Sequence, residues 1–448
     1  MGKRYLKWSY LSGAAAARMG DEMSGPALLL AGFAVGGSVA EASSLLAGIT
    51  VAAAVGGPVL GALLDRSARP GRLLARALAL YGAGLAAILL SLGRLPFALT
   101  VLIAVFTGLL GPALSGGWTA QLPRVVPREQ MPRANALDAM TFSLASLAGP
   151  ALAGVLAKLF GAPAAVVASV ALISLALPAA WRLPADDGPG RGRVAVGRGH
   201  VRGRLPVGRS PVRDRLPADD DLGCDRLPAD HGPARIRPAA GHGPEQGRTT
   251  VSVAGDVVAG FRCITRTRPL ARATLTSVIS CAGLGMLITC NPSLGERAFG
   301  SAADGTMLLS CTAVSALAAN AVLARRPHAI APDTIIWSST LFLAAALLLA
   351  ATGHPALVIA AAVVAGIGEG PQLVALFTIR HREAPERLRS QVFTTGASLK
   401  ITAFAVGAAA AGPLATRSLS AALLTAAGVQ LAAGLSYGAA KFSTRVRG

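Results

Sequence analysis

Apolar stretches recur along most of the chain, each bounded by charged residues or by Gly and Pro. Each has about 20 residues, the length at which an α-helix crosses a bilayer. We predict twelve membrane-spanning helices, six on either side of a polar middle segment. The first six lie near 10–36, 42–64, 73–92, 97–119, 134–159 and 163–181, and the second six near 272–292, 304–324, 334–352, 355–378, 390–412 and 417–438.

The composition supports a membrane protein. The 448 residues are 53% hydrophobic and only 14% charged, whereas soluble domains carry about 25% charged residues. The five cysteines have no spacing typical of a metal site or a disulfide framework. We therefore expect an all-α membrane protein that holds no metal and no cofactor.

The basic residues gather in alternate loops, while the loops between them are short and nearly neutral. This distribution accounts for most of the net charge of +20. The excess of Lys and Arg on one side predicts that both chain termini and the basic loops are cytoplasmic. We expect a multi-pass protein of the plasma membrane, and the basic charge does not indicate nucleic-acid binding because no soluble domain carries it.

The middle segment, 182–247, can be divided into units of eleven residues that each begin with Arg. Pro and Gly occur in nearly every unit and large apolar residues are few, so the units cannot build a core. We predict three regions: a bundle over 1–181, a disordered repeat linker over 182–250, and a second bundle over 251–448. The linker is interpreted as a passive tether, with weak attraction to anionic lipids as the alternative. Residues 249–273 predict an amphipathic cytoplasmic helix before the seventh span.

Gly-Pro pairs recur at matching places in the two halves, offset by 259 and 263 residues. We expect these pairs to bend helices and to allow close packing. They are Gly111 and Pro112, Gly149 and Pro150, Gly370 and Pro371, and Gly412 and Pro413. Two parallel six-helix repeats joined by a long loop are a recognised transporter layout.

The loop between spans two and three reads GALLDRSARPGRLL, residues 61–74. It resembles the signature loop of the major facilitator superfamily, G-x-L-x-D-R/K-x-G-R-K/R, with two residues inserted. The matching residues are Gly61, Leu63, Asp65, Arg66, Gly71 and Arg72. The resemblance implies twelve helices in two pseudo-symmetric bundles that transport by alternating access. It also implies that Asp65 meets the helix beginning near Ser390 and latches the outward-open state. The sequence GPALAG in span five partly resembles the export-associated motif of bacterial drug/proton antiporters.

Span one carries three charges, Arg18, Asp21 and Glu22, which share one arc of a helix. Because an unpaired charge in the bilayer is costly, this arc should face a central cavity. We expect Arg18 to pair with one of the two acids and leave the other to exchange a proton. The alternatives are a static ion cluster that serves packing, or a cluster at the cytoplasmic mouth if span one begins later. Asp138 and Asn135 are expected at the cytoplasmic mouth of span five, near the start of its helix.

Glu369 in span ten and Lys400 in span eleven lie at similar depths on neighbouring helices and are predicted to pair. The pair is either a structural salt bridge or a gating and substrate-binding element. Gln372, Asn291 and Asn320 are candidates for the cavity wall, with interhelical hydrogen bonding as the alternative.

These features predict a secondary transporter that acts as a monomer on a small, amphipathic substrate, with proton-coupled export as the first interpretation. Proton-linked uptake and a non-transporting membrane sensor or scaffold are the alternatives. An enzyme is not expected, because the chain contains no nucleotide-binding loop and no recognisable catalytic constellation.

Overall fold

The computed structural model describes residues 3–36, 39–185 and 252–445. Nearly all of the predicted repeat linker, residues 186–250, lies outside the described residues. The described segments are α-helices, short 3₁₀ turns and their connections, without any strand. The prediction of an all-α fold is confirmed.

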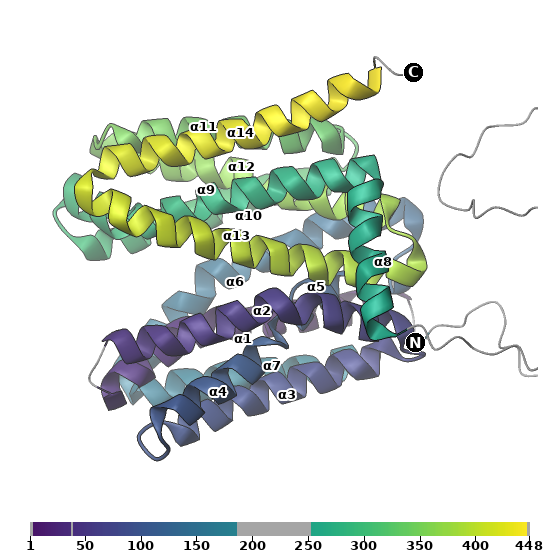
Figure 1. Ribbon diagram of the computed structural model, residues 1–448, viewed down its shortest axis with the longest axis horizontal. Helices are drawn as coiled ribbons and strands as arrows, with labels where there is room; N and C mark the ends of the chain where they lie inside the picture. Colours follow the sequence, from purple (N-terminus) through teal and green to yellow (C-terminus); the bar gives the residue numbers. More distant parts are fainter. Residues whose placement is uncertain (1–2, 37–38, 186–251, 446–448) are drawn as a thin grey trace, which may run out of the picture. The chain divides into compact units, whose positions relative to one another are not determined.

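The first bundle consists of six long helices and a short one (Figure 1). They are α1 (Lys3–Gly36), α2 (Val39–Arg66), α3 (Pro70–Ser91), α4 (Phe97–Gly108), α5 (Gly116–Thr119), α6 (Met131–Phe160) and α7 (Ala162–Trp181). The second bundle contains α9 (Arg268–Phe299), α10 (Gly305–Arg325), α11 (Pro332–Ala351), α12 (Pro355–Glu383), α13 (Arg389–Arg417) and α14 (Leu419–Arg445). Between them, α8 (Val253–Arg266) precedes α9 directly.

The two bundles repeat one packing pattern. In the first, α1 packs on α6 and α7, α3 on α7, and α2 on α4. In the second, the corresponding helices pair in the same way: α9 packs on α13 and α14, α11 on α14, and α10 on α12. The bundles contact each other through α2 with α13 and through α6 with α10. Because α2 corresponds to α10 and α6 to α13, the pseudo-symmetry that relates the bundles converts one of these contacts into the other. The predicted pseudo-symmetry is therefore present in the packing.

Within the described residues, eleven helical segments are long and apolar enough to cross a membrane, and one of them, Phe97–Thr119, combines α4 and α5. The twelfth, α1, has 34 residues but contains Arg18, Asp21 and Glu22, which lower its hydropathy. It packs against α6 and α7 of the first bundle, just as its counterpart α9 packs against α13 and α14 of the second. Packing thus identifies a span that composition alone understates.

The predicted fourth span, 97–119, is interrupted in the structure. It consists of α4, a 3₁₀ turn over Gly111–Ala113 and the short α5. Pro112 removes one backbone N–H from this turn, but Pro371 at the corresponding place in α12 leaves that helix continuous. Close contact with the neighbouring helix does not account for the difference, because Gly366 and Gly370 bring α12 as close to α10 as Gly56 and Gly108 bring α2 to α4.

Most helices extend beyond the predicted apolar limits. For example, α1 begins at Lys3 instead of residue 10, and α12 ends at Glu383 instead of residue 378. Hydropathy marks the part of a helix inside the hydrocarbon, while the helix itself continues into the polar interface. The predicted amphipathic helix over 249–273 is observed as α8, which is shorter and lies across the spans (Figure 1).

The connections at one end of the bundles carry many arginines, and we call this the basic end. It includes Arg66, Arg128, Arg326 and Arg387 and lies at the right of Figure 1. The end with the connections after α3, α6, α9, α11 and α13 is called the opposite end. In Figure 1, α2 and α13 lie closest together at the basic end and diverge toward the opposite end.

Candidate functional site

Asp65, in the last turn of α2, accepts two hydrogen bonds from the first turn of α13. The backbone N–H groups of Ser390 and Gln391 each donate to its carboxylate at 2.9 Å. The first N–H groups of a helix have no partner within the helix and carry partial positive charge. Asp65 therefore caps α13 across the boundary between the bundles, and the contact expected from the signature loop is present.

Gly61 lies one turn before Asp65, where α2 and α13 are in close contact. A side chain at this position would collide with Thr394 and with the backbone of Gln391. On the same interface, Ser398 donates a hydrogen bond to the carbonyl of Ala53 at 2.6 Å. Glycine at 61 is thus required by the close packing that brings Asp65 to α13.

The other residues of the signature loop contact different elements. Leu63 is exposed on the outside of the bundle. Arg66 forms an ion pair with Asp256 of α8. Gly71 packs against the carbonyl of Ala180, and the guanidinium of Arg72 lies over the ring of Trp181 at 5.3 Å. Despite the two-residue insertion, the loop therefore links α2 to α13 and α8, and α3 to α7.

Arg18 is buried, with 2% of its side chain exposed, but the predicted pairing with Asp21 or Glu22 is wrong. Its guanidinium instead donates to Asp138 of α6, at 2.9 Å to the carbonyl and 3.0 and 3.2 Å to the two carboxylate oxygens. Thr119 and Thr141 accept two further bonds from Arg18. A bidentate carboxylate with added hydroxyl groups satisfies a guanidinium better than a single acid on the same helix.

Asp138 does not lie at the mouth of span five, as the sequence suggested. Because α6 begins at Met131, the residue lies about two turns inside the helix. Its side chain is fully buried and also accepts hydrogen bonds from Tyr10 at 3.1 Å and Thr119 at 2.9 Å. Asp138 is the central residue of this polar cluster, and an acid about two turns into an apolar helix was the signal that could have revealed it.

The two acids of α1 have separate environments. Asp21 accepts a hydrogen bond from the hydroxyl of Tyr81 of α3 at 2.7 Å, so it faces the interior of the first bundle. Glu22 accepts one from Ser146 of α6 at 3.3 Å and lines a cavity. Only Glu22 of the charged arc therefore lies where a substrate can reach it.

The cavity has a volume of about 460 Å³ and is formed by both bundles. From the first bundle come Glu22 of α1 and a segment of α6 that includes Ser143 and Ser146. The second bundle supplies most of the wall, largely Leu, Ile and Ala from α9 to α13. The cavity reaches the first turns of α10 and α12 at Leu308 and Val358, and so extends to the opposite end.

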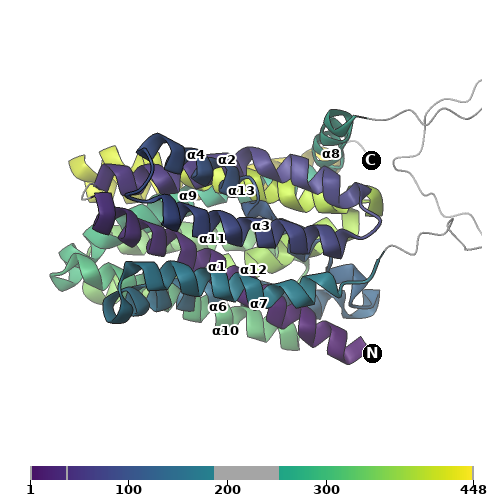
Figure 2. The same ribbon diagram turned by 90° about the horizontal axis from the view of Figure 1, so that it is seen from below.

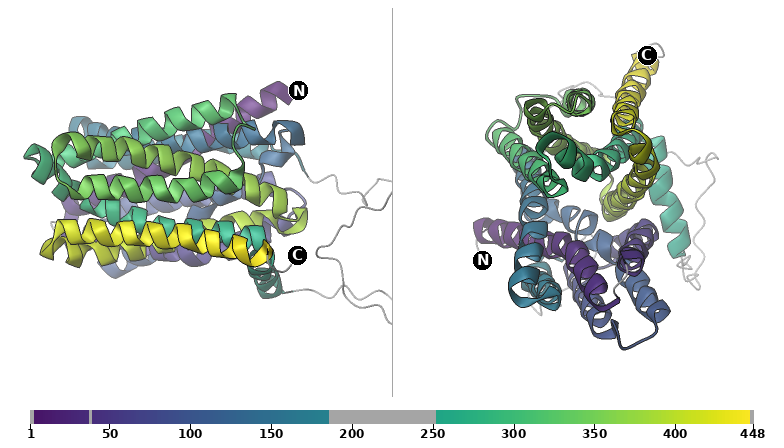
Figure 3. Two further views of the ribbon diagram at one scale, coloured as in Figure 1. Left: turned by 90° about the horizontal axis from the view of Figure 1, so that it is seen from above. Right: turned by 90° about the vertical axis from the view of Figure 1, so that its left-hand side faces the viewer.

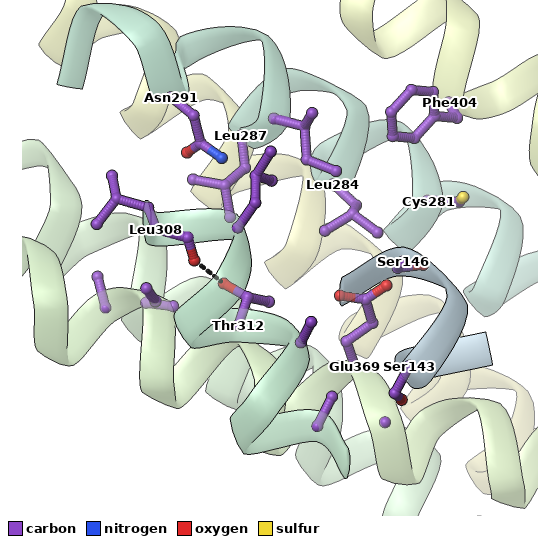
Figure 4. Close-up of a pocket in the computed structure, with 18 of the residues that line it drawn as sticks. Ser143, Ser146, Cys281, Leu284, Leu287, Asn291, Leu308, Thr312, Glu369 and Phe404 are labelled. Atoms are coloured by element: carbon purple, nitrogen blue, oxygen red, sulfur yellow. Dashed lines mark hydrogen bonds between the residues drawn. The ribbon is translucent and has the colours of Figure 1, made fainter. Parts of the chain in front are cut away.

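Glu369 and Lys400 both line this cavity. Figure 4 shows Glu369 beside Ser143 and Ser146, where α12 faces α6. The Glu369 carboxylate interacts electrostatically with Lys400 and with Glu22. The described residues, however, show no direct ion pair between Glu369 and Lys400, so the predicted pairing is wrong at contact distance. Because the Glu369 carboxylate and the Lys400 ammonium group do not bind each other directly, both are available to a molecule in the cavity.

The amide candidates have different positions. Asn291 lines the cavity (Figure 4). Gln372 is not part of the cavity wall. Its amide group instead donates to and accepts from the hydroxyl of Ser280 of α9, at 3.2 and 3.4 Å. Asn320 also lies outside the cavity wall and donates to Ser143 at 3.4 Å across the bundle boundary. For Gln372 and Asn320 the interhelical alternative is therefore the correct one.

A row of aromatic side chains lies between the cavity and the basic end. Phe142 of α6 lines the cavity and stacks on Phe377 of α12, with ring centroids 5.8 Å apart. Phe377 in turn contacts Phe393 of α13, and Phe393 contacts His381, with the ring planes tilted by 44° and 41°. His381 hydrogen bonds to the carbonyl of Thr119 at 3.2 Å. These residues join the two bundles, and sequence reasoning missed them because single aromatic residues in apolar helices carry no distinguishing pattern.

The Gly-Pro pairs act differently from one another. Gly111 and Pro112 form the 3₁₀ turn that interrupts span four. The other three pairs lie inside continuous helices. Among them, Gly149 allows α6 to approach α1 at Glu22, and Pro150 lines the cavity. Gly370 packs against the backbone of α10, whereas Gly412 has open space around it.

No cluster of three or more potential metal ligands occurs in the described part of the chain. The charged groups that line the cavity are Glu22, Glu369 and Lys400. The chemistry open to such a site is reversible protonation of the carboxylates and electrostatic binding of a polar or charged group, within mostly apolar walls.

Comparison with known structures agrees with this architecture. The human organic anion transporter TETRAN has a TM-score of 0.70 at 14% identity, covering 98% of this chain and 100% of that one. A bacterial homologue of the iron transporter ferroportin, in an outward-facing state, has a TM-score of 0.69 at 12% identity, with 97% and 99% covered. The E. coli fucose:proton symporter FucP has a TM-score of 0.63 at 14% identity, with 97% and 98% covered.

At such identities these likenesses concern the fold, and among curated proteins none matches the sequence. The sequence model of the Major Facilitator Superfamily matches residues 10–396, most of the chain. The family resemblance predicted from the signature loop is confirmed, and the fold is that of proteins that carry out secondary transport across a membrane. The chain belongs to the major facilitator superfamily.

Proposed function

We propose that this transporter exports a small amphipathic molecule in exchange for protons. The observation that carries the proposal is that Glu22 of the first bundle and Glu369 of the second line one cavity. A carboxylate that gains or loses a proton changes its attraction for a substrate and for the opposing bundle. Protonation in the cavity can therefore be linked to the relative movement of the bundles.

The shape and lining of the cavity support a small amphipathic substrate. A volume of about 460 Å³ is within the range of sites for small molecules. The walls are mostly aliphatic, with Phe142 and Phe404 as aromatic surfaces and Asn291, Ser146 and Lys400 as polar contacts. An apolar body with one polar or charged group fits this distribution.

The conformation supports alternating access with the basic end closed. Asp65 holds α13, and the stack of Phe142, Phe377 and Phe393 lies between the cavity and the basic end. The distribution of Lys and Arg favours a cytoplasmic location of the basic end and both termini, and our proposal places the protein in the plasma membrane. The structure then corresponds to an outward-open state, from which an exported molecule leaves and a proton enters.

Reconstitution tests this proposal. A thermal-shift screen on the purified protein identifies a ligand, and its accumulation is then measured in inside-out vesicles with an acidic interior. We expect accumulation that depends on the pH gradient and that Glu22→Gln and Glu369→Gln each abolish. Glu296→Gln, at an exposed acid of the opposite end, serves as the matched control and should transport normally.

Other outcomes decide between the alternatives. Accumulation driven by an acidic exterior would indicate proton-linked uptake, with the same residues in use. Transport that both glutamine variants leave unchanged would contradict the coupling role of the two carboxylates. A protein that binds ligands but never moves them across the bilayer would be a membrane sensor.

A further inference from the structure

The helix α8 is the one described helix of two turns or more that lies across the spans. It crosses the outside of the helical bundle at the basic end, beside the ends of α2 and α13 (Figures 1 and 2). The view along the spans, at the right of Figure 3, places it outside the ring of spanning helices. Its contacts are with α2, α9 and α13, so it touches both bundles.

The inner face of α8 is fixed to the protein by specific contacts. Asp256 forms the ion pair with Arg66 of α2. Gly260 is buried against the side chain of Gln391 at the start of α13, where a larger residue would collide with it. Ile264 is 3% exposed and belongs to a core cluster of the second bundle. These three residues hold α8 beside the contact between Asp65 and α13.

The outer face of α8 is apolar in its middle and basic along one edge. Val258 and Phe261 are each 53% exposed, and with the exposed Ala254 and Thr265 they fall within an arc of about 60°. Arg262 and Arg266 are also exposed and follow on one side of this arc, at about 40° and 80° from Val258. The helix therefore has two separate faces, one packed on protein and one without a protein partner among the described residues.

The neighbouring spans show what the outer face meets. On α2 the exposed residues Val51, Val55, Val59 and Leu63 recur every fourth position toward the basic end, as expected for a stripe in contact with lipid. On α9, Leu275 is 53% exposed within two turns of its start. Because α8 packs against α2 and α9 at the basic end, its exposed apolar side chains lie beside helices that also present apolar side chains outward.

We propose that α8 is an interfacial helix whose outer face binds the bilayer surface. Val258 and Phe261 insert at the boundary between headgroups and acyl chains, and Arg262 and Arg266 bind the phosphates of anionic lipids. A basic edge beside an apolar stripe is complementary to an anionic bilayer. Because α8 contacts both α2 and α13, lipid binding also supports the conformation in which the basic end is closed.

Hydrogen–deuterium exchange of the full chain in lipid nanodiscs tests this proposal. The amides of 253–266 are compared in phosphatidylcholine discs and in discs that contain an equal amount of phosphatidylglycerol. Each basic side chain near an anionic surface contributes a factor of about five, so we expect exchange that is up to about 25-fold slower with phosphatidylglycerol. Arg262→Gln with Arg266→Gln should remove this difference between the two lipids.

A matched control is available at the same end of the molecule. Arg325 and Arg326 are exposed neighbours at the end of α10, and replacing both with Gln removes the same charge without touching α8. This variant should keep the full lipid effect. Phe261→Ser should speed the exchange of α8 in both lipids, because it removes the inserted ring and leaves the arginines.

Equal exchange in the two lipids for the wild-type protein would overturn the proposal. So would a lipid effect that survives the double replacement of Arg262 and Arg266, or one that the Arg325 and Arg326 control also loses. None of these readouts depends on transport, so they stand apart from the proposed exchange of substrate for protons.

Discussion

Arg18 in the first bundle and Arg380 in the second are buried to the same extent, each 2% exposed. Arg18 donates to Asp138, Thr119 and Thr141 and lies 3.7 Å from the centroid of the Phe142 ring. Only its Nε atom lacks a partner. The first arginine is therefore a structural element whose charge is neutralised where it lies.

Arg380 has no comparable surroundings. Its Nε and Nη2 atoms are buried without a hydrogen-bond partner, and within the described segments no carboxylate pairs with it. It lies 5.7 Å from the centroid of the Phe393 ring and against the backbone of Gly396. A buried, unpaired guanidinium is costly, and hydration removes that cost.

The positions of the two residues explain the difference. Arg18 binds α6 within the first bundle, and this contact does not change when the bundles move as units. Arg380 lies beside the aromatic residues between the bundles, where opening of the basic end during alternating access would admit water. We interpret Arg18 as a fixed support and Arg380 as a residue that favours opening of the basic end.

Removing the carboxylate that binds Arg18 should have the largest effect on stability, because Arg18 then becomes a buried, unpaired guanidinium like Arg380. Asp138→Ala leaves a buried guanidinium unpaired and should lower the free energy of unfolding by about 3–5 kcal/mol. Thermal melting in detergent measures the loss. The double variant Arg18→Met, Asp138→Leu should recover most of it, since an apolar pair of similar volume replaces the ion pair. A melting temperature equal to that of the wild type after Asp138→Ala would contradict the supporting role.

The same substitution at the two arginines should have effects of opposite sign. Arg380→Met removes a buried charge without a partner and should stabilise the closed basic end by about 1–3 kcal/mol. Arg18→Met leaves Asp138 unpaired and should destabilise the protein. Melting temperatures give the sign, and Arg380→Met should also slow transport by trapping the closed form. If both variants lose stability, Arg380 has a partner in the membrane and the comparison fails.

The contact of Asp65 with α13 opposes the opening that Arg380 favours. Asp65→Asn keeps the size of the side chain but loses its charge, and its amide oxygen can serve only one of the two N–H donors well. We expect the closed conformation of the basic end to lose about 1 kcal/mol of stability, as is usual when a helix N-terminus loses its cap. Alkylation of an Ala136→Cys reporter, buried between the bundles, should become about fivefold faster.

The control for this measurement is the Asp65→Asn variant without the reporter, which corrects for the natural cysteines. Combining Asp65→Asn with Arg380→Met should return the reporter toward its original rate. Unchanged alkylation in Asp65→Asn would show that the cap does not contribute to closure.

The sequence predicted those features that depend on a local pattern. Apolar length identified the spans, and the signature loop led to the contact between Asp65 and Ser390. Helical periodicity was right for one residue of the charged arc, since Glu22 lines the cavity, but Arg18 and Asp21 do not. In each of these cases the informative residues lie within one helix or one loop, so their spacing carries the information.

The sequence failed where a long side chain selects a partner on another helix. Periodicity gives the direction of Arg18 from its own helix, but not that Asp138 faces it from α6. It likewise placed Glu369 and Lys400 at similar depths on neighbouring helices, but it did not give the distance between those helices, and so it predicted an ion pair that these two described residues do not form. Packing distances between helices determine these outcomes, and a single sequence does not contain them.

The smallest expected effect concerns Gly396, which lies against the guanidinium of Arg380. Replacing a helical Gly with Ala gains about 1 kcal/mol in helix propensity, but at 396 the new methyl group must displace Arg380. The two effects oppose each other, so Gly396→Ala should change stability by less than about 0.5 kcal/mol.

Two controls show whether Arg380 is the cause of that cancellation. Gly412→Ala, in the same helix with open space around it, should show the full gain in the melting temperature. Gly396→Ala should also show it when Arg380 is already Met, because the shorter, uncharged side chain can move aside. A double-mutant cycle in melting measures this coupling. Zero coupling would mean that the guanidinium of Arg380 does not pack against Gly396. The interpretation of Arg380 as a buried, unpaired charge at this position would then be contradicted.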